Sequence, residues 1–142
     1  MNKKEFIRGY MQAALWSSIC IDSDDCEYLD EKYDESDLAK ETLEQMEKDC
    51  IQFIKENDDD LFEYAEQRSI PFDADYTESD CAGHDFWLTR NALGSGFWAR
   101  GLKRLGDKLT SATEKFAHVE LYVGDDGKIY HMENTRKTMK TI

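Results

Sequence analysis

The stretch Gly83-His84-Asp85-Phe86-Trp87-Leu88-Thr89-Arg90-Asn91 gathers aromatic, ionisable and amide side chains within an otherwise acidic chain. Inside it, residues 85–89 alternate between two sets of side chains, with Phe86 and Leu88 forming one set. Successive side chains of an extended chain point to opposite faces. The alternation therefore predicts a strand over 85–89.

The residues after this stretch predict a helix and a hairpin. The loop 94–96 leads into residues 97–116, where apolar side chains recur at helical spacing. This stripe consists of Trp98, Leu102, Leu105, Leu109, Ala112 and Phe116. Residues 119–123 then alternate between apolar and polar, and residues 128–132 return as the partner strand after the strong turn signal Gly124-Asp125-Asp126-Gly127.

The first half of the chain is predicted to be helical. Apolar stripes mark a helix over 4–20, a second helix that Ser36 or Asp37 can cap, and a shorter helix over 61–68. The inward residues of the second and third helices are Ala39, Leu43, Met46, Cys50, Phe53, Ile54, Leu61, Phe62 and Ala65. Pro71 marks a break, and residues 71–82 are predicted to form a polar loop.

Helices first and strands later indicate an α+β fold, with three to four helices packed on a small antiparallel β-sheet. A length of 142 residues fits a single domain over 1–142. Within this domain, 1–70 is a helical acidic half, 71–135 a strand–helix–hairpin half, and 136–142 a polar tail.

The net charge of −13 arises in the middle of the chain, where residues 22–80 carry 23 acids and five bases. Such a field repels nucleic acid, so direct DNA or RNA binding is not expected. It favours a partner with a basic surface, and it equally fits a solvated face that only keeps the protein soluble. The residues predicted to bind such a partner are Asp22, Asp24, Asp25, Glu41, Glu44, Glu47, Asp58, Asp59, Asp60 and Glu63. If helix packing aligns them, they form a continuous negative stripe that imitates the phosphate backbone of DNA.

Other classes of function have weaker signals. The chain lacks an apolar run of the roughly 18 residues that a membrane span needs, so no membrane role is expected. Its first residues predict an amphipathic helix and not a signal peptide, which favours the cytoplasm. The four cysteines are then expected to be free buried thiols. No metal site and no cofactor is predicted, and the oligomeric state is left open.

The second candidate site is the quoted stretch with the loop that follows it. An enzyme or a small-ligand-binding protein would use His84, Asp85, Trp87, Arg90, Asn91 and Ser95. A catalytic pair of His84 and Asp85 needs a bulge, because a regular strand points the two side chains apart. The alternative is structural, with His84 capping the strand and Asp85 paired to Arg90 or to a helix N-terminus.

The glycines and aromatics of this region also have two interpretations. The loop 94–96 would present N–H groups to an anion or simply make a tight turn into the helix. Trp87, Phe97 and Trp98 would stack a base or belong to the core, and Trp98 begins the apolar stripe of the predicted helix. The sequence contains no nucleophile motif and no dinucleotide fingerprint.

Four segments of the chain carry a resemblance to a known group of proteins. They are Ala14-Leu15-Trp16-Ser17-Ser18, the helix 38–50, Ala82-Gly83-His84-Asp85-Phe86-Trp87-Leu88-Thr89-Arg90-Asn91, and Leu121-Tyr122-Val123-Gly124-Asp125-Asp126-Gly127-Lys128. Together they resemble a family of small acidic proteins found mainly in bacteriophages and related mobile elements. The chain departs from that pattern at Ala92-Leu93-Gly94, where the family commonly has Gly-His-Gly, and at Ala99, where it has an acid.

The resemblance implies a phage accessory gene that acts early or on the host, and it implies no assigned reaction. For a phage protein, the expected cytoplasm is that of the host cell. With the acidic middle of the chain, it predicts a protein that binds and inhibits a host or anti-phage defence protein. The expected partner handles nucleic acid, and the inhibitor imitates DNA. The alternatives are the enzyme or ligand-binding protein centred on His84, Asp85, Arg90 and Asn91, and a virion or assembly component.

Overall fold

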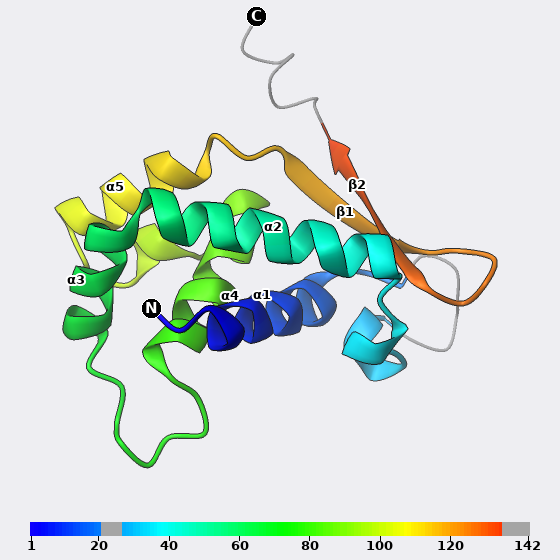
Figure 1. Ribbon diagram of the computed structural model, residues 1–142, viewed down its shortest axis with the longest axis horizontal. Coiled ribbons are helices and arrows are strands. Elements are labelled where there is room, and N and C mark those ends of the chain that lie inside the picture. Colours follow the sequence, from blue (N-terminus) through cyan, green and yellow to red (C-terminus); the bar gives the residue numbers. More distant parts are fainter. Residues whose placement is uncertain (21–26, 135–142) are drawn as a thin grey trace, which may run out of the picture.

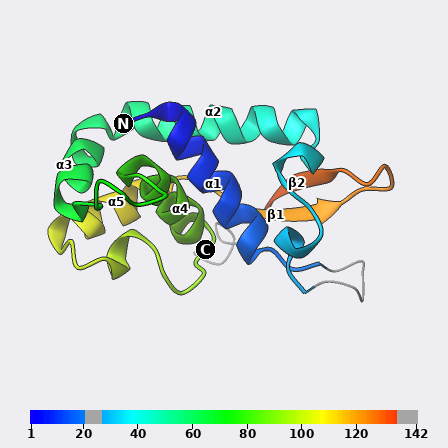
Figure 2. The ribbon, with the colours of Figure 1, turned by 90° about the horizontal axis from the view of Figure 1, so that it is seen from below.

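Two helices that are far apart in the sequence cross at the centre of the computed structural model, which describes residues 1–20 and 27–134. They are α1 (Lys3–Ser17) and α4 (Glu78–Arg90), and Figure 2 shows them side by side. The crossing is close because glycines face each other across it. A Cβ added at Gly9 would overlap the carbonyl oxygen of Asp80, and one at Gly83 would overlap that of Phe6. The two backbones therefore touch without a side chain between them.

The helix α4 replaces the predicted strand over 85–89, which is wrong. Its first turn also takes up part of the predicted loop 71–82. Thr77 caps the helix, because its hydroxyl accepts from the Asp80 N–H while the Asp80 carboxylate accepts from the Thr77 N–H. Residues 85–90 are all buried, so α4 is enclosed on nearly every side. A helix enclosed in this way loses the one-sided apolar pattern by which helices are predicted.

The longest helix, α2 (Lys40–Glu56), crosses the front of the molecule in Figure 1. Its predicted apolar stripe is confirmed, since Met46, Cys50 and Phe53 are buried. The predicted cap at Ser36 or Asp37 is wrong, because these residues belong to a short 3₁₀ turn, η2 (Glu35–Asp37). The helix starts later, where the Ala39 N–H and the Thr42 hydroxyl both donate to the carbonyl of Ile129.

The third helix, α3 (Asp58–Arg68), follows α2 directly and begins earlier than predicted. Its inward face differs from the predicted one, because Tyr64 and not Phe62 belongs to the core. Phe62 is 66% exposed, while Tyr64 is completely buried. Leu61 is buried as predicted.

The predicted helix over 97–116 is two elements in the structure. A 3₁₀ turn, η3 (Phe97–Ala99), precedes the shorter helix α5 (Arg104–Thr113). Positive φ angles at Gly101 and Lys103 break the helix between them. Trp98 is consequently 53% exposed and does not begin the buried stripe, which the residues from Leu102 onward do form.

The hairpin is confirmed as an antiparallel pair of β1 (His118–Val123) and β2 (Ile129–Asn134). The Gly124–Gly127 turn closes it, with the Gly124 N–H donating to the Lys128 carbonyl. Val119, Leu121 and Ile129 face the helices and are buried. Within the described residues, five α-helices pack with this two-stranded sheet, so the α+β fold is confirmed. The predicted tail 136–142 lies outside the described residues.

The core is a cluster of aromatic rings contributed by both predicted halves of the chain. Phe53 of α2 stacks on Phe86 of α4 with ring centroids 4.2 Å apart. Phe6 of α1, Phe97 of η3 and Phe116 surround this pair. Because one core joins the acidic half to the hairpin half, the described residues form a single domain.

Candidate functional site

Arg90 belongs to the alternative ligand site expected from the sequence, but its side chain is only 1% exposed. It donates to the Asp49 carboxylate over 2.7 Å, to the Tyr10 hydroxyl over 3.2 Å and to the Ala117 carbonyl over 2.6 Å. These contacts join α1, α2 and α4 to the start of the hairpin. Arg90 is therefore a buried connector, and the predicted pairing of Asp85 with Arg90 is wrong.

Asp85 pairs instead with Arg100, on the other side of α4. The Arg100 guanidinium donates twice to one Asp85 oxygen, over 2.9 and 2.7 Å, and the Tyr64 hydroxyl donates to the other over 2.7 Å. Asp85 is 1% exposed. Burial and the neighbouring Asp85 charge raise the pKa of Tyr64, so this hydroxyl keeps its proton and remains a donor.

A cavity of about 370 Å³ opens beside this ion pair, and we call it the arginine pocket. It is lined by Gln12, Arg68, Tyr76, Asp80, Cys81, His84, Asp85 and Arg100. His84 and Asp85 reach one cavity because they are neighbours on a helix and not on a strand. Ser95 lies next to it, since Arg100 also donates to the Ser95 hydroxyl over 3.4 Å.

Two titratable groups of the arginine pocket, His84 and Cys81, are held in neutral forms. Burial lowers the pKa of His84, whose ring lies 5.7 Å from that of Trp16. Burial also raises the pKa of the Cys81 thiol. Cys81 is therefore protonated at neutral pH and lacks the thiolate that a nucleophile needs. In these forms the His84 imidazole can accept a hydrogen bond and the Cys81 thiol is a weak donor.

Trp87 and Asn91 serve the packing of α4 rather than this cavity. The Trp87 indole donates to the Ser17 hydroxyl over 2.7 Å. The Asn91 amide donates to the Trp87 carbonyl and accepts from the Val119 N–H over 2.8 Å. The structure thus brings His84, Asp85 and Ser95 together and separates them from Trp87, Arg90 and Asn91.

A larger hollow, of about 780 Å³, runs along the exposed side of α1, and we call it the acidic groove. One wall comes from α1 and His84, and the other from the segment 27–37, which includes η1 (Leu29–Glu31) and η2. Figure 2 shows α1 between α4 and this segment. The second wall contributes Asp30, Tyr33, Asp34, Glu35 and Ser36, while Trp16 lies on the first.

The segment 27–37, which forms the second wall, is strongly acidic. It carries six acids, Glu27, Asp30, Glu31, Asp34, Asp37 and Glu35, against the single base Lys32. Asp34 and Glu31 also hold the backbone of the two turns by accepting from nearby N–H groups. The side chains of Asp30 and Glu35 are exposed, so their carboxylates face whatever enters the groove.

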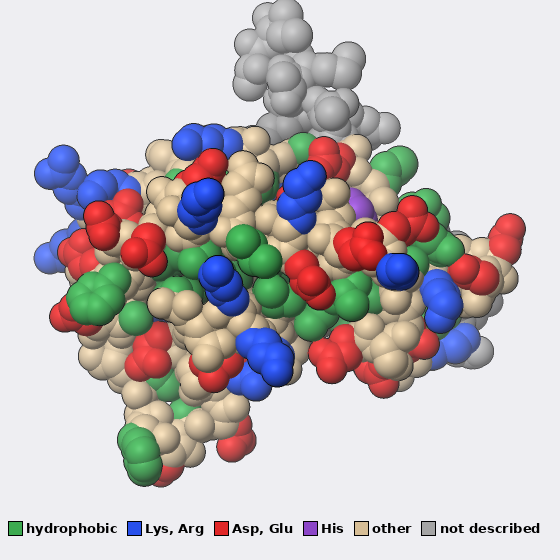
Figure 3. Space-filling view, in the orientation of Figure 1, with side chains coloured by type: hydrophobic (Ala, Val, Ile, Leu, Met, Phe, Trp, Pro, Cys, Tyr) green, Lys and Arg blue, Asp and Glu red, His purple; other side chains and the backbone are tan. Residues whose placement is uncertain are grey.

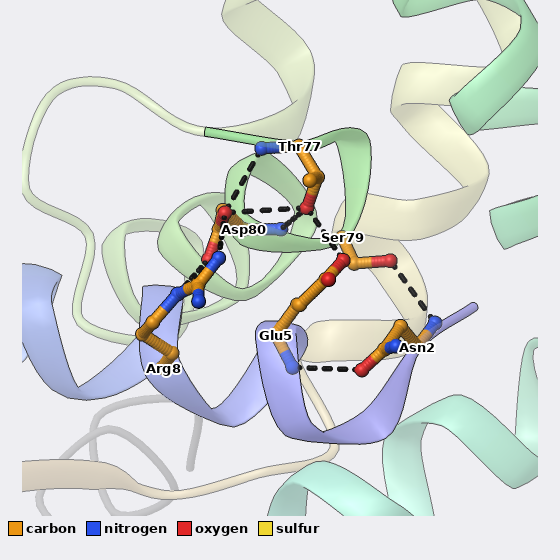
Figure 4. A network of polar contacts seen from close by, with 6 residues as sticks. All are labelled: Asn2, Glu5, Arg8, Thr77, Ser79 and Asp80. Carbon is orange, nitrogen blue, oxygen red and sulfur yellow. Dashed lines mark hydrogen bonds and ion pairs between the residues drawn. The ribbon is translucent and has the colours of Figure 1, made fainter. Parts of the chain in front are cut away.

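An ion pair lies between the two hollows, because Arg8 lines the acidic groove and Asp80 lines the arginine pocket. Arg8 donates to the two Asp80 oxygens over 2.8 and 2.6 Å, and Figure 4 shows this pair beside the cap of α4. Burial alone would raise the pKa of Asp80, but the hydrogen bonds from Arg8 and Thr77 hold it below its usual value. Gln12 and His84 line both hollows.

The predicted acidic residues do not all lie together. Glu41, Glu44 and Glu47 are exposed on α2, yet Lys40, Lys48 and Lys55 are exposed on the same helix. Figure 3 shows acidic and basic side chains interspersed over the face that α2 crosses. Asp60 pairs with Lys108 over 3.3 Å, while Asp58, Asp59 and Glu63 belong to α3. Asp22, Asp24 and Asp25 lie outside the described residues.

The acidic groove and the arginine pocket depend on residues that the sequence analysis did not select. Arg68 and Arg100 meet His84 and Asp85 only through the packing of α3 and η3 on α4. No local sequence pattern predicts that these four residues lie close together. For the start of α4 a signal did exist, since Thr77 and Asp80 have the spacing of a capping box.

Cysteines, membrane spans and metals complete the description. Cys20 is disulfide-bonded, against the expectation of free thiols, while Cys50 and Cys81 are free. None of the helices within 1–20 and 27–134 is long and apolar enough to cross a membrane. Across the same residues, the side chains of His, Cys, Asp and Glu form no group of three suited to a metal ion.

Comparison with known proteins adds no relative to this description. No protein-family model matches the chain, and searches of curated proteins and of solved structures return no match.

Proposed function

We propose that this protein inhibits a host or anti-phage defence protein by holding a basic surface of that partner in the acidic groove. The observation that carries the proposal is the position of Asp30, Asp34 and Glu35 along one wall of a hollow of about 780 Å³. A concave surface with several carboxylates on one side is complementary to Lys and Arg side chains.

The aromatic residues of the groove add to this complementarity. Trp16 is 55% exposed, and Tyr33 lies on the wall opposite it. A guanidinium that enters between them can pair with a carboxylate while stacking on a ring. This combination favours arginine-rich surfaces over surfaces that carry only lysine.

Proteins that handle nucleic acid present such arginine-rich surfaces to the phosphate backbone. A carboxylate-lined groove that occupies this surface would exclude the nucleic acid, which is inhibition by DNA mimicry. The resemblance to small acidic bacteriophage proteins supports a host-directed role. The mixed charge of α2 favours the groove, rather than α2, as the centre of the contact.

The function is tested by capture of partners from a lysate of the host cells. The tagged protein is incubated at about 50 mM salt and then washed up to about 1 M, where exposed ion pairs are screened. We expect a nucleic-acid-binding protein that elutes as salt rises and that duplex DNA displaces. A captured protein that remains bound in the presence of excess DNA would contradict inhibition by DNA mimicry.

A second arm separates this function from that of a virion component. Purified phage particles are probed for the protein in the same infection. An inhibitor of a host protein should be absent from the particles and present in the infected-cell lysate. Enrichment in the particles would contradict the proposed function.

A further inference from the structure

Three arginines share the two carboxylates of the arginine pocket: Arg68 and Arg100 line it, and Arg8 reaches Asp80 from the acidic groove. Of its two carboxylates, Asp80 accepts from Arg8 and Thr77, and Asp85 accepts from Arg100 and Tyr64. Every carboxylate oxygen in the cavity wall therefore already has a donor. This leaves Arg68, which lines the same cavity, without a carboxylate of its own.

Arg68 is the last residue of α3, and its guanidinium carbon lies 5.9 Å from the centroid of the Tyr64 ring. Within the described part of the chain it has no carboxylate at ion-pair distance. Its Nε is shielded from solvent and has no hydrogen-bond partner. A shielded guanidinium nitrogen without an acceptor costs free energy. The Arg68 guanidinium also interacts with the Cys81 thiol, which is only a weak acceptor, so the positive charge of Arg68 is left for an oxyanion in the cavity to neutralise.

We propose that the arginine pocket binds a small organic anion whose carboxylate or phosphate group lies against Arg68. Gln12 and His84 provide further polar contacts for the oxyanion, and Tyr76, which is 50% exposed, provides a flat ring for the organic part. A volume of about 370 Å³ exceeds what a bare ion needs and is within the range of small-molecule pockets. The protonated Cys81 and the neutral His84 suit binding without chemistry.

This inference does not rest on the proposed partner. The protein as a whole carries a charge of −13 and attracts cations, whereas the ligand proposed for this cavity is an anion. The arginine pocket and the acidic groove share Gln12 and His84, so an anion in the pocket lies next to whatever occupies the groove.

The test uses three probes that share a phenyl ring: benzoate, phenyl phosphate and the neutral benzamide, which has nearly the shape of benzoate. Binding is measured by calorimetry, and the location by amide chemical-shift changes in the full-length protein. We expect one or both anions to bind with shifts centred on Arg68, His84 and Arg100, and benzamide to bind at least about tenfold more weakly. The stronger anion distinguishes a carboxylate ligand from a phosphate ligand.

Matched variants give the control. Arg68→Gln should weaken binding of the stronger anion about tenfold or more, because it removes a charge-assisted contact. Arg104→Gln makes the same charge change at an exposed position of α5 and should leave affinity within about twofold. Equal losses in both variants would overturn the proposal, as would equal affinity for benzoate, phenyl phosphate and benzamide. The shift map needs no variant, and shifts confined to other surfaces of the wild-type protein would also overturn it.

Discussion

Arg90 shows at the scale of one residue how much of this fold depends on a single buried charge. Its guanidinium is enclosed by Asp49, Tyr10 and the Ala117 carbonyl, with the Phe116 ring 5.3 Å away. In such a setting the net stabilisation that the Arg90–Asp49 ion pair provides is smaller than the free-energy cost of leaving one of the two charges buried without the other. Arg90, a candidate for ligand binding in the sequence, is thus a residue that stabilises the fold.

We predict that Arg90→Met lowers the free energy of unfolding by about 3–5 kcal/mol, because Asp49 is left buried without its partner. Urea denaturation measures the loss. The control Arg104→Met removes an exposed arginine and should change stability by about 0.5 kcal/mol or less. The double variant Arg90→Met with Asp49→Leu should recover much of the loss. A single-variant loss below about 1 kcal/mol would contradict this account of Arg90.

His84 gives a prediction for pH. Burial lowers the pKa of His84 from its ordinary 6.5, with Asp85 opposing and Arg100 adding to the shift. The unfolded chain therefore takes up this proton at a higher pH than the folded protein does. The corresponding stability is complete above about pH 6.5 and declines as the pH falls below that value.

Two measurements check this. The imidazole signal of His84 in an NMR titration should have its midpoint below pH 6.5. The variant His84→Gln should lose part of the fall in unfolding free energy between about pH 7 and pH 5.5. A midpoint at or above 6.5 would show that the imidazole is not desolvated in the pocket.

At the scale of elements, the crossing of α1 and α4 depends on Gly9 and Gly83. At both positions an added methyl group would meet backbone atoms of the other helix, which cannot rotate away. The two helices would have to separate, and the ring contacts of Phe6 and Tyr10 with Phe86 would loosen. The glycine at the start of the most distinctive stretch is therefore a packing residue.

We predict that Gly83→Ala destabilises the protein by about 3 kcal/mol or more, although alanine is the better helix former. The control Ser111→Ala lies on the exposed face of α5 and should have little effect. Thermal unfolding of both variants makes the comparison. A Gly83→Ala protein as stable as the wild type would mean that the helices do not touch as described.

The same scale shows which elements the sequence could predict. α1, α2 and the hairpin were predicted because each buries one face and exposes the other, so its period is visible. In α4, residues 85–90 are buried on all sides, so no polar face reveals the helical period. The alternation of side chains over 85–89 then resembles that of a strand. The helix break at Gly101 and Lys103 has no periodic signal, since a positive φ interrupts an otherwise continuous stripe.

The candidate sites follow a similar rule. His84 and Asp85 were candidates because they lie within one unusual stretch of sequence, and Ser95 because it lies in the glycine loop that follows it. Arg68 and Arg100 were not, because they come from α3 and from the residue after η3 and meet only through tertiary packing. The sequence did not predict the burial of Arg90 either, because its partner Asp49 is distant in sequence and belongs to an acidic helix.

At the scale of the whole molecule, the acidic residues form separate groups. Figure 1 shows the segment 27–37 near the start of α2 and the helix α3 near its end. Between them, α2 exposes lysines beside its glutamates. A single continuous stripe of negative charge, as expected from the sequence, therefore does not run along α2. The concave group at 27–37 is the one that shares a groove with aromatic side chains.

The central claim is that this groove, and not the surface of α2, binds the basic partner. The most direct measurement is the affinity of the captured partner for two double variants with the same charge change. Asp30→Lys with Glu35→Lys alters the groove, and Glu41→Lys with Glu47→Lys alters α2. The account predicts that the groove variant binds about tenfold or more weakly at about 100 mM salt, while the α2 variant stays within about threefold of the wild type. Loss of binding in the α2 variant, with the groove variant unchanged, would contradict it.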